Sequence, residues 1–158
     1  MKTIIIFLGF VSLSAGILQS QQTTVTIEEF LTRPFGFEPT VAAFTNCKTP
    51  QYKLKKYIFK KHPTDTIYQF RYKKSELFFN RSQQQEIFFS GIINHCRILM
   101  LNNIYVGMSR DRFLASFSNL AAPVSDAVEI RKEGFKNVYT FIFKNNTLTE
   151  IKISNIHK

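Results

Sequence analysis

The chain has 158 residues, with 21 Lys and Arg against 11 Asp and Glu and a formal net charge of +10 at pH 7. This length is enough for one domain, or for two very small ones that share a core. Acidic residues are few and mostly fit helix starts, turns or strand faces, which argues against a hydrolase built on paired carboxylates. The positive charge instead favours contact with anionic surfaces or polymers.

The first 20 residues have the layout of a secretory signal peptide. Lys2 precedes an apolar run over residues 4–11, small residues follow, and cleavage would fit after Gly16 or Ser20. A transmembrane anchor is the alternative, but the run is well short of the roughly 20 residues that a spanning helix needs. No Cys lies near the cleavage site, which argues against a lipid-modified N-terminus.

We therefore expect an exported protein, periplasmic or secreted, with no transmembrane segment after signal cleavage. Lys2 is the only charge that cleavage removes, so the mature chain keeps 20 basic and 11 acidic residues and a net charge of +9.

Two short helices are predicted at the start of the mature chain. Residues 26–31 begin a helix that Thr26 can cap, and Glu29, three residues later, completes a capping-box pattern. Pro34 disfavours a long continuation. A second apolar patch, over residues 41–44, indicates another helical turn.

A series of strands follows, rich in aromatic and β-branched residues. Residues 62–65 and residues 74–75 have the composition of turns. The predicted strands cover residues 52–60, 66–73, 76–80, 86–93 and 97–101. Residues 66–73 alternate, with Ile67, Gln69, Arg71 and Lys73 on one face and Tyr68, Phe70 and Tyr72 on the other.

Residues 104–153 form a recognisable helix-and-hairpin module. A period-2 apolar segment enters a Gly-Met-Ser turn at residues 107–109, and a short helix follows with Ser109 as its cap. A two-stranded hairpin that turns at Asn145 and Asn146 closes the module.

The two halves of the chain share a pattern that favours an internal repeat. Residues 67–77 align with residues 138–148 in their apolar and aromatic positions, and residues 26–31 align with residues 109–114. The alternative is a chance likeness, because strands use few residue types. Two segments that match in the same order favour the repeat.

The predicted organisation is a signal peptide over residues 1–20, a first helix-plus-sheet unit over residues 21–98 and a second over residues 99–158. The predicted fold class is α+β. Antiparallel strands of both units would form one or two adjoining sheets, with the helices on one face.

The two cysteines, Cys47 and Cys96, both lie after the signal peptide. In an oxidising compartment they are most simply a disulfide, worth ~4 kcal/mol in the chain-entropy model. Two buried thiols are one alternative. A reactive Cys96 beside His95 is another, although neighbours along the chain do not supply the geometry that a thiol nucleophile needs.

The sequence contains no assembled active site. Its histidines, His62, His95 and His157, are scattered without metal-ligand spacing. Neither a Gly-rich phosphate loop nor a Gly-x-Ser-x-Gly elbow occurs. We therefore assign no catalytic, cofactor-binding or metal-binding residues, and we expect a protein that is not an enzyme and uses no cofactor.

Basic and aromatic residues interleave between residues 53 and 74, against a single acid, Asp65. Such a face fits an anionic polymer such as lipopolysaccharide or nucleic acid. A solvated face whose lysines protect a strand edge from aggregation explains the same pattern, and we favour it for an exported protein. The candidate anionic-ligand contacts are Lys53, Lys55, Lys56, Lys60, Lys61, Arg71, Lys73 and Lys74.

The run Gly107-Met108-Ser109-Arg110-Asp111, with Ile104 and Val106 before it and Phe113 after it, resembles the Ile-x-x-Gly-Met-Thr/Ser entry of the BamE/SmpA family of outer-membrane assembly lipoproteins. Tyr139, Phe141, Phe143, Leu148 and Ile151 resemble the closing hairpin of that family. The duplicated helix-then-sheet order is similar to the β-lactamase-inhibitor protein, which belongs to the same broad fold group.

This chain departs from the family pattern, because the lipidated Cys is absent and residues 119–123 replace the usual Gly-x-Pro after the helix. The resemblance therefore implies membership of the fold group more than of the assembly machine. It implies a non-catalytic envelope or secreted module that presents a sheet face to another protein.

The sequence thus predicts an exported, non-catalytic protein that acts by protein–protein interaction in the cell envelope. The candidate protein contacts are Tyr68, Tyr72 and Tyr139, because aromatic residues on a rigid sheet make good anchors. A basic sheet face that binds an anionic polymer is one alternative. A small-molecule binder or enzyme, which would need a concave pocket with converging polar groups, is the other.

Overall fold

The computed structural model of the chain describes residues 24–59, 62–121 and 125–156, so the predicted signal peptide lies outside the described residues. Its helices are α1 (Ile27–Thr32), α2 (Val41–Thr45) and α3 (Arg110–Ala115), with a 3-10 turn η1 (Leu101–Asn103). Its strands are β1 (Lys53–Phe59), β2 (His62–Tyr72), β3 (Ser75–Arg81), β4 (Glu86–Ile93), β5 (Ala127–Ile130), β6 (Asn137–Lys144) and β7 (Thr147–Asn155).

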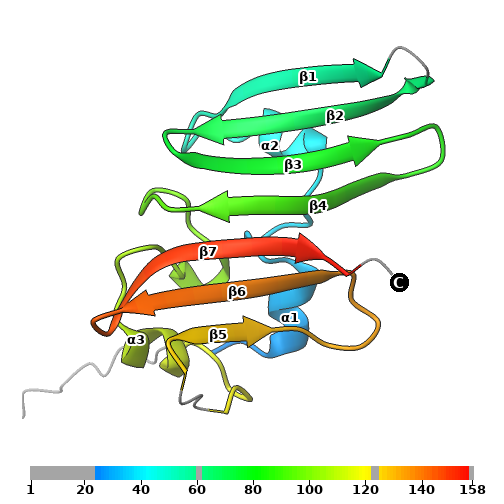
Figure 1. Ribbon diagram of the computed structural model, residues 1–158. Coiled ribbons are helices and arrows are strands. Elements are labelled where there is room, and N and C mark those ends of the chain that lie inside the picture. Colours follow the sequence, from blue (N-terminus) through cyan, green and yellow to red (C-terminus); the bar gives the residue numbers. More distant parts are fainter. Residues whose placement is uncertain (1–23, 60–61, 122–124, 157–158) are drawn as a thin grey trace, which may run out of the picture.

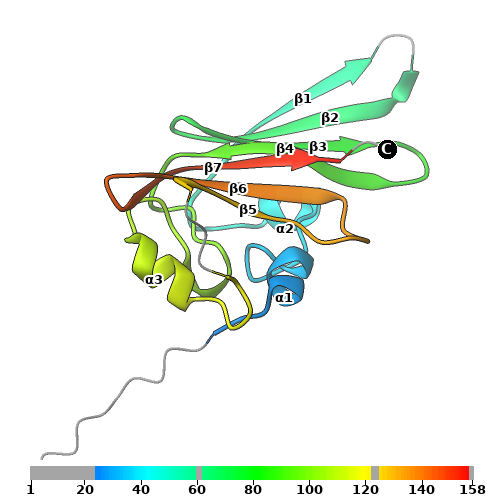
Figure 2. The ribbon, with the colours of Figure 1, turned by 60° about the horizontal axis from the view of Figure 1, so that its bottom comes forward.

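These seven strands form one sheet in the order β1-β2-β3-β4-β7-β6-β5, and every neighbouring pair is antiparallel (Figure 1). The helices lie on one side of the sheet, which we call the inner face, and the opposite side is the outer face (Figure 2). The predicted α+β class with an antiparallel sheet is confirmed. The strands of the two halves of the chain meet where β4 pairs with β7.

The helix starts lie where the capping signals predict them. Thr26 accepts a hydrogen bond from the Glu29 backbone N–H at 3.1 Å, and the Glu29 carboxylate accepts one from the Thr26 N–H at 2.9 Å. Ser109 accepts from the Arg112 N–H at the start of α3. The positive φ angles of Asn145 and Asn146 turn the chain between β6 and β7, as expected.

The structure differs from the predicted strands and turns at three places. Residues 62–65 continue β2 and do not form a turn. Residues 97–101 are a loop that adds only an isolated bridge at Met100, and its Ile98 and Met100 side chains are buried. The short edge strand β5 was not predicted. An apolar loop that packs against a core has the same composition as a strand, so periodicity did not distinguish them.

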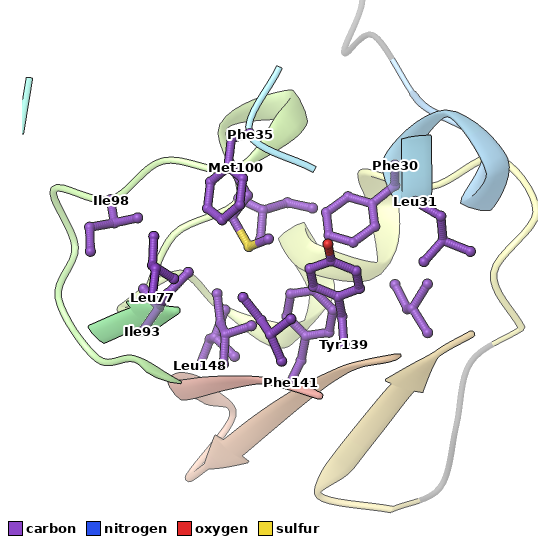
Figure 3. Packing of buried hydrophobic residues seen from close by; sticks show 14 of the residues in the cluster. Phe30, Leu31, Phe35, Leu77, Ile93, Ile98, Met100, Tyr139, Phe141 and Leu148 are labelled. Carbon is purple, nitrogen blue, oxygen red and sulfur yellow. The ribbon is translucent and has the colours of Figure 1, made fainter. Parts of the chain in front are cut away.

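One hydrophobic core lies between the sheet and the helices (Figure 3). Phe30 of α1 packs edge-on against Tyr139 of β6, with ring centroids 5.2 Å apart. Phe44 of α2 contacts Phe70 and Phe79 at 5.6 and 5.4 Å. The first helix of the chain therefore covers strands from its C-terminal half, and the second helix covers strands from its N-terminal half.

Polar contacts also attach α1 to the C-terminal half of the chain. The Val25 N–H donates to the Ser116 carbonyl at 3.0 Å, and the Ile27 N–H donates to Asn119 Oδ1 at 2.9 Å. A helix from the predicted first unit thus supports strands of the predicted second unit. The two-unit repeat is not confirmed and stays a prediction.

The Gly107-Met108-Ser109 turn docks on the β6–β7 hairpin. The Gly107 N–H donates to the Leu148 carbonyl at 2.7 Å, and the Leu148 N–H donates to the Met108 carbonyl at 2.9 Å. Gly107 has φ +109°, which residues with a side chain rarely adopt, and the Met108 side chain is buried. The turn is a structural connector between η1 and α3.

The predicted disulfide is not formed, because Cys47 and Cys96 are both free thiols. Cys47 is half-buried and its thiol donates to the Thr49 carbonyl at 3.5 Å, whereas Cys96 is exposed. Cys47 precedes β1 and Cys96 follows β4, and β2 and β3 lie between those strands.

Candidate functional site on the outer face of the sheet

The outer face of β1–β4 has an apolar centre. Tyr57 of β1 lies opposite Ile67 of β2, and Phe78 of β3 lies opposite Ser90 of β4. Side chains alternate between the two faces along a strand, and these four side chains point to the face opposite the helices. Tyr57 is 47% exposed and Ile92, at the end of β4, is 43% exposed.

A β-bulge shapes this centre. Phe78 pairs with Ser90 and Phe79 pairs with Phe88, so Phe89 is an extra residue in β4. The ring centroids of Phe89 and Phe78 are 6.3 Å apart. The two rings lie in a groove of about 390 Å³, which we call the aromatic groove and which is lined by Tyr57, Ile67, Gln69, Phe78, Phe89 and Ser90.

Polar groups border the aromatic groove on the side of β1. Tyr57 Oη donates a hydrogen bond to Gln69 Oε1 at 2.8 Å, which holds the tyrosine ring at the groove. Lys55 lies opposite Gln69 in the strand pair, and Lys53 lies opposite Arg71. An aromatic centre with a polar, positively charged rim is the usual anatomy of a protein-binding surface.

Five of the predicted anionic-ligand contacts gather near one end of the sheet. Lys53, Lys55 and Arg71 share the outer face of β1 and β2. Lys73 and Lys74 form the turn between β2 and β3, next to the start of β1 (Figure 1). The structure brings these five residues near one another, and their role as contacts for an anionic ligand stays a prediction.

Lys56 is a predicted contact that does not join that cluster. Lys56 points to the inner face, with Nζ 5.6 Å from the centre of the Tyr68 ring, where Arg81 also lies at 5.1 Å. Lys60 and Lys61 lie outside the described residues. The predicted contacts that the structure describes therefore form a compact patch. A long polymer would need a continuous row of cations along one face.

The predicted protein contacts all lie on the inner face. Tyr68 and Tyr72 are half-buried, and the Tyr72 ring is 5.0 Å from His95. Tyr139 is 0% exposed, so the expectation of a surface contact there is wrong. Burial raises the pKa of Tyr139 above its ordinary value, and the Asn137 side chain opposes part of this rise. The buried Tyr139 hydroxyl has no hydrogen-bond partner of normal geometry among the described residues.

One ion pair at the inner face has a structural role. Glu86 accepts hydrogen bonds from the Val41 N–H at 2.6 Å and from Arg81 Nε at 2.7 Å, so it joins the start of α2 to β3. The same hydrogen bond raises the pKa of Arg81. Because Glu86 accepts from the first N–H of α2, the pair fits a role in capping that helix.

Two further findings bear on the kind of site. Across the described residues, no group of three or more His, Cys, Asp or Glu side chains is placed to hold a metal ion. None of the described helices is long and apolar enough to cross a membrane.

The aromatic groove itself was missed by sequence reasoning. In β3 the run Leu77-Phe78-Phe79 is apolar on both faces, so alternation does not show which ring is covered. The signal that could have revealed the groove was the excess of aromatic residues. A sheet with one solvent-exposed face needs apolar residues only at every second position of a strand.

Comparisons of this chain with protein-family models, with curated proteins and with solved structures found no match. The site therefore has to be interpreted from its own geometry, and the resemblance to the BamE/SmpA family and to the β-lactamase-inhibitor protein stays a prediction.

Proposed function

We propose that this chain is an exported, non-catalytic protein that binds a partner protein in the cell envelope through the outer face of β1–β4. The observation that carries the proposal is the aromatic groove, which lies on the face of the sheet opposite the helices (Figure 2). Aromatic side chains on paired strands lose little conformational entropy on binding, so they anchor a partner efficiently.

Two further features support the broader proposal. The layout of residues 1–20 supports export, and the Gly107-Met108-Ser109 motif supports membership of the fold group of BamE/SmpA and the β-lactamase-inhibitor protein. The proposed duplication is supported by the β2–β3 and β6–β7 hairpins, since Phe70 and Phe141 occupy matching inward positions.

Site-specific photocrosslinking in the producing cell tests the proposed face. A photoreactive residue at Phe89 is expected to give one discrete adduct with a partner that mass spectrometry identifies. The matched control is the same residue at Thr140, which lies on the outer face of β6 opposite Lys152. Adducts of equal yield at both positions, or none at Phe89, would show that the groove is not the contact.

The partner found in this way then allows a quantitative test. Phe89→Ser is expected to weaken binding of the purified partner by about tenfold or more, as for a central aromatic anchor. Thr140→Ser is expected to leave the affinity unchanged. Export is tested separately by sequencing the N-terminus of the protein from the periplasmic or secreted fraction, and unprocessed protein confined to the cytoplasm would refute it.

A further inference from the structure

We propose that the end of the sheet at the β2–β3 turn holds a binding site for a dianionic oxyanion group of the phosphate type. A hollow of about 410 Å³ lies there, lined by Gln51, Lys53, Arg71, Tyr72 and Lys73. The lining of the aromatic groove shares none of these residues, although Lys53 and Arg71 also lie on the outer face beside that groove.

Positive charge is concentrated in this hollow. Lys53 and Arg71 are directly opposite each other across β1 and β2, where like charges destabilise an antiparallel pair. Lys73 follows the end of β2 and adds a third cation. Glu76 Oε1 lies 3.3 Å from Arg71 Nε, but Lys53 and Lys73 have no ion-pair partner within the described ranges.

The backbone at Lys73 points to a role beyond turn formation. Lys73 has φ +56°, a left-handed conformation that is unfavourable for a residue with a Cβ. The β6–β7 turn meets the same requirement with Asn145 and Asn146, which tolerate that region. A lysine is a worse turn residue than asparagine, and what it adds at this point is charge beside Lys53 and Arg71.

Another hollow lined by cations shows the contrast. It measures about 590 Å³ and is lined by residues 131–136 and Ile156. There Arg131 Nε lies 3.0 Å from Glu129 Oε1, and Lys132 is paired with Glu28. Acidic side chains already neutralise Arg131 and Lys132, and only Lys136 of the cations in that hollow lacks an ion-pair partner among the described residues. Two of the three cations at the β2–β3 turn lack one.

The donors at the turn match a phosphate group better than a single carboxylate. Arg71 uses Nε toward Glu76 and keeps its terminal N–H groups for a second oxyanion. Two lysine ammonium groups balance a double negative charge, and the Gln51 amide adds a neutral donor. The bound group is either free phosphate or a phosphate monoester at the end of a larger molecule.

Titration of the processed protein with inorganic phosphate and with glycerol phosphate, followed by NMR, tests the site. Saturable shifts are expected for Gln51, Lys53 and Lys73 and not for Arg131 and Lys132. Saturation by both probes supports a site for phosphate in general, and saturation by the monoester alone supports a site for a phosphate carried on a larger molecule. Absence of saturable shifts with both probes would overturn the proposal.

A pair of neighbouring variants makes the test specific. Lys73→Asn removes one cation from the hollow and is expected to weaken binding by about tenfold or more, while its thermal midpoint stays equal or rises. Lys74→Asn removes the same charge one residue away, outside the hollow, and is expected to change the affinity by less than about twofold. Equal losses in the two variants would indicate diffuse electrostatics and overturn the site. Lys53→Gln tests the same hollow from β1.

Discussion

The two halves of the sheet bury similar inner faces and present different outer faces. On β1–β4 the outer face carries the rings of Tyr57, Phe78 and Phe89. On β6 and β7 the pair facing outward is Ile142 and Glu150, and Lys152 Nζ lies 3.3 Å from Glu150 Oε1. An ion-paired outer face is all that a sheet covered on one side needs in water. The outer face of β1–β4 is more aromatic than this requirement, and the partner protein proposed above is our explanation for it.

The inner faces of the two halves differ in which helix covers them. Phe30 of α1 packs on Tyr139 of β6 (Figure 3), while Phe44 of α2 packs on β2 and β3. This crossed arrangement makes the halves mutually dependent. Four tests break or sharpen the comparison.

Replacing the central phenylalanine of either half is expected to have the largest effect. Phe30→Ala and Phe44→Ala should each lower the free energy of unfolding by ~3–5 kcal/mol, since each deletes a buried aromatic ring. Chemical denaturation should show one cooperative transition for both variants. Two separate transitions would mean that the halves fold independently, contrary to a shared core.

Gly91 tests the seam at which β4 joins β7. A Cβ there would lie 2.8 Å from Leu77 Cδ2 and 3.2 Å from Ile153 Cδ1. Gly91→Val is therefore expected to destabilise the protein by ~1–3 kcal/mol through overpacking. Ser154→Val, on the exposed side of the same strand pair, is the control and should change stability by less than ~0.5 kcal/mol. Equal stability of the two variants would show that the seam is loosely packed.

The buried hydroxyl of Tyr139 distinguishes the inner face from a contact surface. Tyr139→Phe is expected to leave the free energy of unfolding unchanged or to raise it by up to ~1 kcal/mol, because the hydroxyl is buried without a hydrogen bond among the described residues. Thermal denaturation measures this difference. A clear loss of stability would reveal a hydrogen bond that the phenol needs.

The contact between Glu28 and Lys132 should produce the smallest effect, and one that depends on pH. The hydrogen bond from Lys132 is the main cause that lowers the pKa of Glu28 from 4.5 to about 2. Because the folded-state pKa is depressed, the stabilisation is present above pH 4.5 and is lost as the pH falls toward 2. Glu28→Gln should flatten the acid limb of a stability profile measured by urea denaturation. A profile identical to that of the parent protein would show that the pair is fully screened.

Much of the local structure was predictable from the sequence, because it depends on residues a few positions apart. The capping box at Thr26, the cap at Ser109 and the turn at Asn145 and Asn146 are examples. The alternation of β2 was also predicted correctly, with Ile67 and Tyr68 on opposite faces. The loop that contains Ile98 and Met100 was misassigned, because tertiary packing buries apolar side chains without making a strand.

The candidate sites were predictable only in part. Lys53, Arg71 and Lys73 were identified as a basic group from composition alone, and the structure brings them to one hollow. The tyrosines chosen as protein contacts lie on the covered face, while Phe78 and Phe89 on the outer face went unnoticed. Composition shows which residues can bind, but it does not show which face of a strand the helices will cover.

The sequence by itself determined the short helices, the hairpin turns and the two-sided character of the strands, since these follow from backbone propensity and spacing. Only the tertiary structure decided that β4 pairs with β7, that α1 covers β6, and that Cys47 and Cys96 are free thiols. The physical reason is that strand order and helix placement depend on contacts between residues distant along the chain. Those contacts decide which aromatic face is buried and which one is left exposed.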